Sequence, residues 1–362
     1  MSSVETIAKR NVRERLGKVW FLVAFLVTTS LPIIILIILD WLNIESFYVF
    51  NLKFLFLSTW KGRMFYLFFS WLLLLELIID WDEIAERKPK NPFRVFAFFV
   101  AVAVPLIYVV SVNFWGLNEF ITSIGRDLGF TGYSLEFHWP LSAEYLVFTV
   151  SFLVAIFLAY GKEGLKFFSI ALSLLVGMCI IYTLDTFYPA GAFKPFEMLA
   201  LPTSACAAAL LDILGYSVSL QYNSGAGSMP LITISGKLPV AAYVGWPCAG
   251  VQSLFLFAVI ILLLFKRSNI SSYRKFAYFV VGAVGTYFVN ILRIASYFVI
   301  FISNGATTAD FFHSSLGELY FVAWISFYIM MIVLIEKYKL IEKARGSVRK
   351  LYSISGNIKN RV

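Results

Sequence analysis

Long apolar stretches alternate with short polar segments along most of the chain. A helix needs about 20 mostly apolar residues to cross a bilayer. The pattern predicts eight such helices, approximately at 20–39, 64–79, 95–115, 144–160, 165–186, 250–265, 276–302 and 315–335. Aromatic residues gather at the ends of several stretches, as they do at membrane interfaces. The expected fold class is therefore an all-α polytopic membrane protein with about eight transmembrane helices.

The stretch between the fifth and sixth predicted spans, 187–246, breaks this pattern. Residues 196–215 are only moderately apolar and include Pro202, so we expect an interfacial or re-entrant helix there rather than a full span. Polar and apolar residues alternate at 217–222 and 231–243, which predicts short strands. This stretch is expected to form a small extracytoplasmic cap that contains short β-strands.

Charge sets the expected orientation. The chain has 30 Lys and Arg against 21 Asp and Glu, a net charge of +9. With eight spans, most of the Lys and Arg lie on one side, and cytoplasmic segments are the ones enriched in these residues. We therefore expect a multi-pass cell-membrane protein with both termini in the cytoplasm, and no nucleic-acid partner. A ninth span at 196–215 would instead place the basic tail outside.

Composition supports the membrane interpretation. The chain is 60% hydrophobic and 14% charged, whereas soluble proteins carry about a quarter charged residues. We expect no cleavable signal peptide, because the first apolar run is too long for one. Three cysteines predict no disulfide framework. A polar loop is expected at 116–143.

Three candidate residues lie at the predicted outer ends of the last three spans. Cys248 stands between Pro247 and Gly250 at the start of the sixth span, where unpaired helix amides favour the thiolate that attacks carbonyls. Arg293 lies inside the seventh span, about one or two turns from its outer end, where a charge usually faces a protein interior or an aqueous cavity. His313 precedes the eighth span, and imidazole suits proton transfer near neutral pH.

Each residue also has a purely structural interpretation. A lone cysteine is usually buried, and an arginine near a span end can extend to the interface. A lone histidine is more often structural. We rank His313 above His138, because the predicted topology places His313 near the outer Cys248 and Arg293. Together, however, Cys248, His313 and Arg293 supply a nucleophile, a proton carrier and a stabiliser for an oxyanion. Neither a metal nor another cofactor is expected, because no second His or Cys stands at ligand spacing and no glycine-rich phosphate loop is present.

These motifs resemble the exosortase and archaeosortase family of membrane cysteine transpeptidases. The family pattern is Cys-Ser-Gly with a serine three residues on, then Asn-x-x-Arg, then His. The corresponding segments here are Pro247-Cys248-Ala249-Gly250 with Ser253, then Asn290-Ile291-Leu292-Arg293, then His313. Ala249 replaces the usual serine, so any role of that hydroxyl is absent.

The resemblance implies an enzyme that cleaves a C-terminal sorting signal of secreted proteins. That signal has a short motif, a hydrophobic helix and a basic cluster. Cys248 would be the nucleophile, Arg293 the transition-state stabiliser and His313 the proton-transfer residue, with Asn290 and Ser253 in support. The protein would pass through a thioester to a lipid or other envelope acceptor, near the extracytoplasmic face. We prefer the archaeal branch, because the extra C-terminal domains of large bacterial exosortases are not seen.

The resemblance also predicts a division of the chain. Residues 1–129 would form a divergent or added N-terminal region of about three spans, 130–336 the catalytic core, and 337–362 a basic cytoplasmic tail. Two other function classes stay open. One is a transporter or channel in which Arg293 lines an anion pathway, which inverted repeats would support. The other is a non-catalytic assembly factor, for which loss of Cys248 would be harmless.

Overall fold

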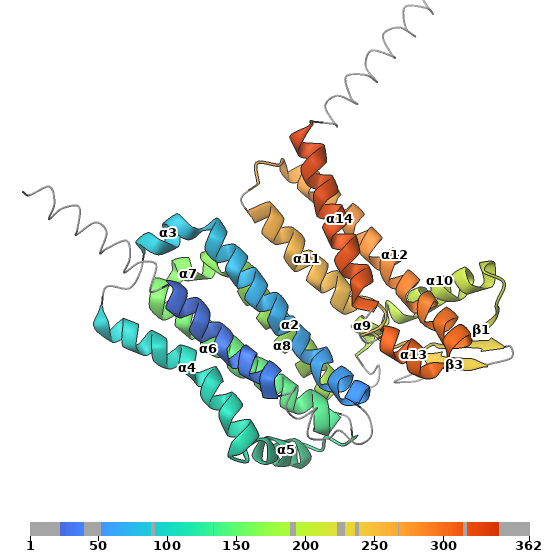
Figure 1. Ribbon diagram of the computed structural model, residues 1–362, viewed down its shortest axis with the longest axis horizontal. Helices are drawn as coiled ribbons and strands as arrows, with labels where there is room; N and C mark the ends of the chain where they lie inside the picture. Colours follow the sequence, from blue (N-terminus) through green and yellow to red (C-terminus); the bar gives the residue numbers. More distant parts are fainter. Residues whose placement is uncertain are drawn as a thin grey trace, which may run out of the picture. The chain divides into compact units, whose positions relative to one another are not determined.

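The computed structural model describes residues 22–39, 52–87, 91–132, 134–188, 193–222, 229–235, 239–266, 268–313 and 317–339. Helices dominate these ranges (Figure 1). Within them, seven helices are long and apolar enough to cross a membrane: Leu22–Leu39, Pro92–Phe114, Ser134–Tyr160, Ser169–Phe187, Pro195–Ile213, Ser272–Asn304 and Leu319–Lys337. Shorter apolar helices, Phe65–Ile79 and Val251–Lys266, match the second and sixth predicted spans. The predicted all-α polytopic fold class is confirmed. The predicted basic tail lies outside the described residues beyond 339.

Part of the predicted polar loop at 116–143 is helical, which corrects the sequence expectation. Helix α5 (Leu117–Asp127) lies within it, and η1 (Ser134–His138) leads directly into α6 (Trp139–Tyr160). The Trp139 indole donates a hydrogen bond to the Ile121 carbonyl over 2.6 Å, which attaches α5 to α6. Because α5 is amphipathic, a search for uniformly apolar stretches does not detect it.

The segment expected to be re-entrant forms two helices, α9 (Lys194–Glu197) and α10 (Ala200–Ile213), with turn residues between them. Taken together, Pro195–Ile213 is long and apolar enough to be a candidate span. The 14 residues of α10 alone reach about 21 Å, less than the roughly 30 Å of a bilayer's hydrocarbon core. Its re-entrant placement stays a prediction.

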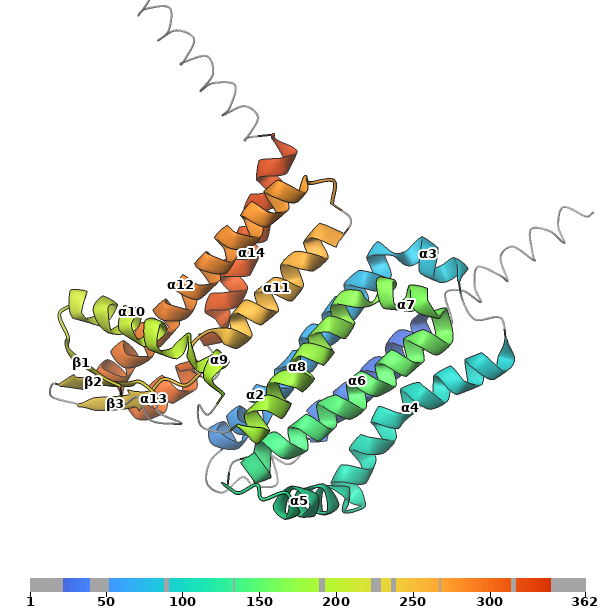
Figure 2. The ribbon, with the colours of Figure 1, turned by 180° about the vertical axis from the view of Figure 1, so that it is seen from behind.

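The chain forms two compact units, Met1–Ala249 and Gly250–Val362. In the first unit, five long helices run side by side (Figures 1 and 2): Leu22–Leu39, α2 (Leu52–Ile79), α4 (Pro92–Phe114), α6 and α8 (Ser169–Phe187). The short helix α3 (Trp81–Glu86) lies between α2 and α4, and α7 (Lys162–Phe167) lies between α6 and α8. Helix α6 packs against both α4 and α8. Stacked rings of Tyr66, Tyr145 and Tyr182, with centroids 4.5 and 5.3 Å apart, join α2, α6 and α8.

Two carboxylates buried in this bundle receive hydrogen bonds from the protein itself. Glu144 is 3% exposed and accepts from Arg63 Nε over 3.1 Å and Nη2 over 2.9 Å. Glu76 is fully buried, and its two oxygens accept from the backbone N–H groups of Ile170 (3.1 Å) and Ala171 (2.9 Å). The first amides of a helix lack partners within it. Glu76 of α2 therefore caps the start of α8.

A small sheet follows α10, as the alternation in the sequence predicts. Strands β1 (Ser217–Gln221), β2 (Leu231–Ser235) and β3 (Val240–Tyr243) form an antiparallel sheet in the order β1-β2-β3. Ser217 pairs with Ser235, and Ile234 pairs with Val240. The side chains of Ile232, Ile234 and Val240 are buried, and α10 packs against β1 and β2. The predicted strands are confirmed.

The second unit contains α11 (Val251–Lys266), α12 (Ser272–Asn304), α13 (Ala306–Phe311) and α14 (Gly317–Lys337). Helix α12 packs against the other three. Glycines on α12 permit close approach, because a methyl group at Gly282 would clash with Phe257 of α11 and one at Gly285 with Trp324 of α14. The Trp324 indole also donates to the Thr286 hydroxyl over 3.0 Å.

The cap that Glu76 provides can be tested by substitution. Glu76→Gln removes the charge and leaves one oxygen for two amides, so we expect a loss of about 1–2 kcal/mol in stability. Thermal unfolding in detergent measures it. Glu163→Gln, at an exposed carboxylate of α7, should leave the midpoint unchanged. Equal midpoints for both variants would show that the cap contributes nothing.

Candidate functional site

Arg293 is buried within the second unit rather than extended toward an interface. It is 8% exposed, and its Nη2 donates to the backbone carbonyl of His313 over 2.8 Å. It lies about three turns before the end of α12 at Asn304, deeper than the one or two turns that the sequence predicts. The chain reverses at Gly305, whose φ is +85°, and α13 then packs back along α12. This reversal brings the His313 carbonyl to the arginine.

A pocket beside Arg293 gathers further candidate residues. It is small and is lined by Ser253, Thr286, Val289, Asn290, Arg293, Gly317, Tyr320 and Phe321. Asn290 is 4% exposed and lies one turn before Arg293 on the same helix face. The structure therefore brings Arg293 and the predicted supporting residues Asn290 and Ser253 to one pocket.

The backbone that follows the cysteine segment also contacts this pocket. Gly250 has a φ of +103°, and a Cβ on it would lie 3.1 Å from Asn290 Nδ2. A side chain at this position would therefore be strained and crowded. Gly250 allows the start of α11 to lie directly against Asn290.

His313 follows α13 and precedes α14, at the position predicted for it. Its ring lies edge-on to Tyr297, with centroids 5.4 Å apart. The Tyr297 hydroxyl donates to Asp310 Oδ1 over 3.2 Å. The bond to Arg293 uses the backbone carbonyl of His313, while the imidazole packs against Tyr297.

Cys248 lies in a tight turn at the end of the first unit. The N–H groups of Cys248 and Ala249 both donate to the Gly245 carbonyl over 3.0 Å. The hydroxyl of Thr203, on α10, donates to the Ala249 carbonyl over 3.1 Å. The cysteine is half-buried and lies three residues before α11 begins at Val251.

Sequence reasoning missed the polar residues that surround this turn. Asp185 of α8 and Glu197 of α9 both bond to Trp246, two residues before Cys248. A carboxylate at the end of an apolar span was the available signal, because such a group needs a partner. The identity of that partner could not be read from the sequence.

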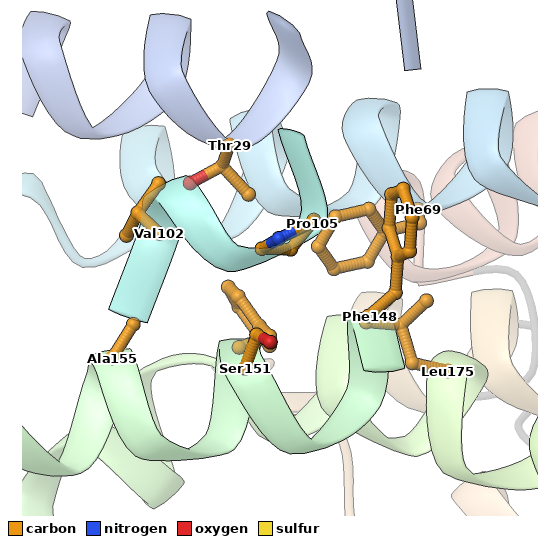
Figure 3. Close-up of a pocket in the computed structure, with 9 residues that line it drawn as sticks. Thr29, Phe69, Val102, Pro105, Phe148, Ser151, Ala155 and Leu175 are labelled. Carbon is orange, nitrogen blue, oxygen red and sulfur yellow. The ribbon is translucent and has the colours of Figure 1, made fainter. Parts of the chain in front are cut away.

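A second pocket, in the first unit, has a different character. It is lined by Thr29, Phe69, Val102, Pro105, Phe148, Ser151, Phe152, Ala155 and Leu175. Figure 3 shows these side chains gathered between neighbouring helices. None of the nine lining residues is charged. This pocket therefore suits apolar contents and offers no fixed charge for an anion.

The close fit around Arg293 leads to a prediction for Gly317. A Cβ there would lie 2.6 Å from Arg293 Nε and 3.2 Å from the Phe312 carbonyl, so Gly317→Ala should cost about 1–3 kcal/mol through overpacking. Most of this loss should disappear in an Arg293→Ala background, which removes the closest atom. Thermal unfolding of the four variants measures the coupling. An equal penalty in both backgrounds would contradict the described packing.

Comparison with known proteins identifies a family. The family described as Transmembrane exosortase (Exosortase_EpsH) matches residues 58–332, well over half of the chain. No curated protein and no solved structure gave a match. The matched range includes the cysteine turn and the pocket beside Arg293. The chain therefore belongs to the transmembrane exosortase family, and this membership supports a multi-pass membrane protein with a transpeptidase type of function on protein substrates.

Proposed function

We propose that the protein is a cysteine transpeptidase that cleaves a C-terminal sorting signal from secreted proteins and transfers them to a lipid or other envelope acceptor. Cys248 is the nucleophile, Arg293 stabilises the transition state and His313 transfers protons. Asn290 and Ser253 support the site. No metal or other cofactor takes part in this scheme.

One observation carries the proposal: Arg293 is buried and bonded to the residue that supplies the imidazole. Its Nη2 donates to the His313 carbonyl over 2.8 Å, and Asn290 and Ser253 line the same pocket. Cys248 stands two residues before Gly250, the first residue of this unit. With family membership, this arrangement favours a transpeptidase over a transporter or an assembly factor.

The first half-reaction forms a thioester. The Cys248 thiolate attacks the carbonyl carbon of the scissile peptide bond, and the carbonyl oxygen becomes an oxyanion. The guanidinium of Arg293 stabilises that developing charge. When the tetrahedral intermediate collapses, the C–N bond breaks and the leaving amine takes a proton from His313.

The second half-reaction restores the Cys248 thiolate. An acceptor amine or hydroxyl gives its proton to His313 as its lone pair attacks the thioester carbonyl. The C–S bond then breaks, and the secreted protein is joined to the acceptor. Water in place of the acceptor would give hydrolysis. The protonated histidine is ready for the next substrate, so the cycle consumes no external proton.

We further propose that this chemistry takes place near the extracytoplasmic face, with both termini in the cytoplasm. The excess of Lys and Arg in the predicted cytoplasmic segments supports this orientation. The hydrophobic helix of the sorting signal can then lie in the bilayer while its scissile bond reaches the site. The archaeal branch of the family is our preferred assignment.

Substitution of the nucleophile tests the function. A secreted protein with a C-terminal tripartite signal is co-expressed with each variant, and its mass is followed. Cys248→Ala should abolish processing, by a factor of about a thousand or more, because no thioester can form. His313→Ala should reduce it by about 10²–10⁴-fold, as expected for loss of a general acid and base.

The other two cysteines provide matched controls. Cys206 is exposed on α10 and Cys179 lies within α8, and alanine at either position should leave processing normal. Normal processing by Cys248→Ala would exclude the proposed nucleophile. A stable Cys248→Ala protein in the membrane, shown by immunoblot, makes either result interpretable.

A further inference from the structure

Trp246, two residues before Cys248, is held at two points by carboxylates. Its indole Nε1 donates to Asp185 Oδ1 over 2.9 Å, and its backbone N–H donates to Glu197 Oε1 over 3.2 Å. Its ring also lies 4.9 Å from the ring of Phe196. The tryptophan is 3% exposed. Both its side chain and its backbone are therefore fixed by residues from α8 and α9.

The second oxygen of Asp185 faces a histidine. Nδ1 of His138, the last residue of η1, lies 3.0 Å from Asp185 Oδ2. Asp185 is 6% exposed, and a buried carboxylate is stable only where donors or positive groups surround it. With one oxygen near His138 and the other bonded to Trp246, the direction of this carboxylate is set from both sides.

A purely structural role for Asp185 would be to join the continuous segment of η1 and α6 to α8. A neighbouring pair already does this: the hydroxyls of Ser142 on α6 and Thr186 on α8 lie 2.9 Å apart, and both residues are buried. That pair does not involve Trp246. The distinctive feature of Asp185 is therefore its link to the turn that carries Cys248.

The turn is held on its other side as well. Thr203 is fully buried and donates to the Ala249 carbonyl, one residue after the cysteine. Restraints thus act immediately before and after Cys248, whose side chain is half-buried. A rigid turn with an accessible side chain is the arrangement that a nucleophile requires, because small displacements of a reacting atom are costly.

We propose that Asp185, oriented by His138, is a positioning residue that fixes the direction of the Cys248 thiol through Trp246. Glu197 holds the backbone of the same tryptophan. The role as nucleophile rests on the proposed function, but the positioning itself does not. His138, which the sequence ranks below His313, acts in this arrangement through the carboxylate and not on the substrate.

A double-mutant cycle tests the proposal in the full-length protein. Cys179→Ser and Cys206→Ser leave Cys248 as the only thiol, and its alkylation rate by iodoacetamide is measured by mass spectrometry. Asp185→Leu and Trp246→Phe are made singly and together. Trp246→Phe keeps an aromatic ring near Phe196 and removes the indole N–H together with part of the indole ring, so it provides a second test if Asp185→Leu does not fold.

We expect each single variant to raise the alkylation rate about tenfold as the turn loosens, and the double variant to show no further increase, because coupled residues are not additive. Asp185→Asn keeps an oxygen for Trp246 and should stay within about threefold of the parent. In the proposed reaction, Asp185→Leu should lower kcat about tenfold or more with KM nearly unchanged.

Thr186→Val is the matched control. It removes the neighbouring bond between α6 and α8, and the alkylation rate of Cys248 should not change. The proposal is overturned if Asp185→Leu and Trp246→Phe react like the parent, if their effects multiply in the double variant, or if Thr186→Val has the same effect.

The two proposals fail separately. Normal processing by Cys248→Ala would remove the proposed function and leave the alkylation results valid. Unchanged alkylation in the cycle would remove the positioning role and leave Cys248 as the nucleophile.

Discussion

A charged side chain among membrane-spanning helices is stable only when the protein supplies its partners, because hydrocarbon offers none. The fold meets this constraint repeatedly. Glu76 accepts the first amides of α8, Glu144 accepts two bonds from Arg63, and Arg293 donates to the carbonyl of His313. The first two pairings join helices that are distant in sequence, whereas the third joins α12 to a residue only 20 positions further along the chain. These polar groups thus help to fix which segments meet, while apolar burial supplies most of the stabilisation.

The same constraint links stability to the proposed chemistry. Burial of Arg293 requires an acceptor, and the acceptor comes from the residue whose ring is the proposed proton carrier. One hydrogen bond therefore gives the buried cation an acceptor and holds the backbone of His313 beside it. The reversal at Gly305 makes this possible, because it returns the chain along α12. Asp185 is a similar case, because the indole N–H of Trp246 that stabilises its buried carboxylate also belongs to the turn that carries Cys248.

Length and apolarity were enough to locate the spans, because bilayer thickness sets both. They did not reveal α5, which is apolar on one face only. The depth of Arg293 was underestimated because it depends on where α12 ends and how the chain returns. The order of Cys248, Arg293 and His313 identified the family by resemblance. The bond between Asp185 and Trp246 could not be predicted from the sequence, because 61 residues separate them and neither local sequence specifies the pairing.

The proposed function requires Cys248 and His313 to act at one site, and cross-linking tests this requirement directly. His313→Cys is introduced into a protein whose only other cysteine is Cys248, and mild oxidation is applied in the membrane. We expect rapid formation of a disulfide, which requires Cα atoms about 4.4–6.8 Å apart, or cross-linking by a short bismaleimide. Thr308→Cys, on the exposed side of α13, should form no cross-link to Cys248, either by oxidation or with the bismaleimide. Failure of His313→Cys to cross-link by either route would contradict the account.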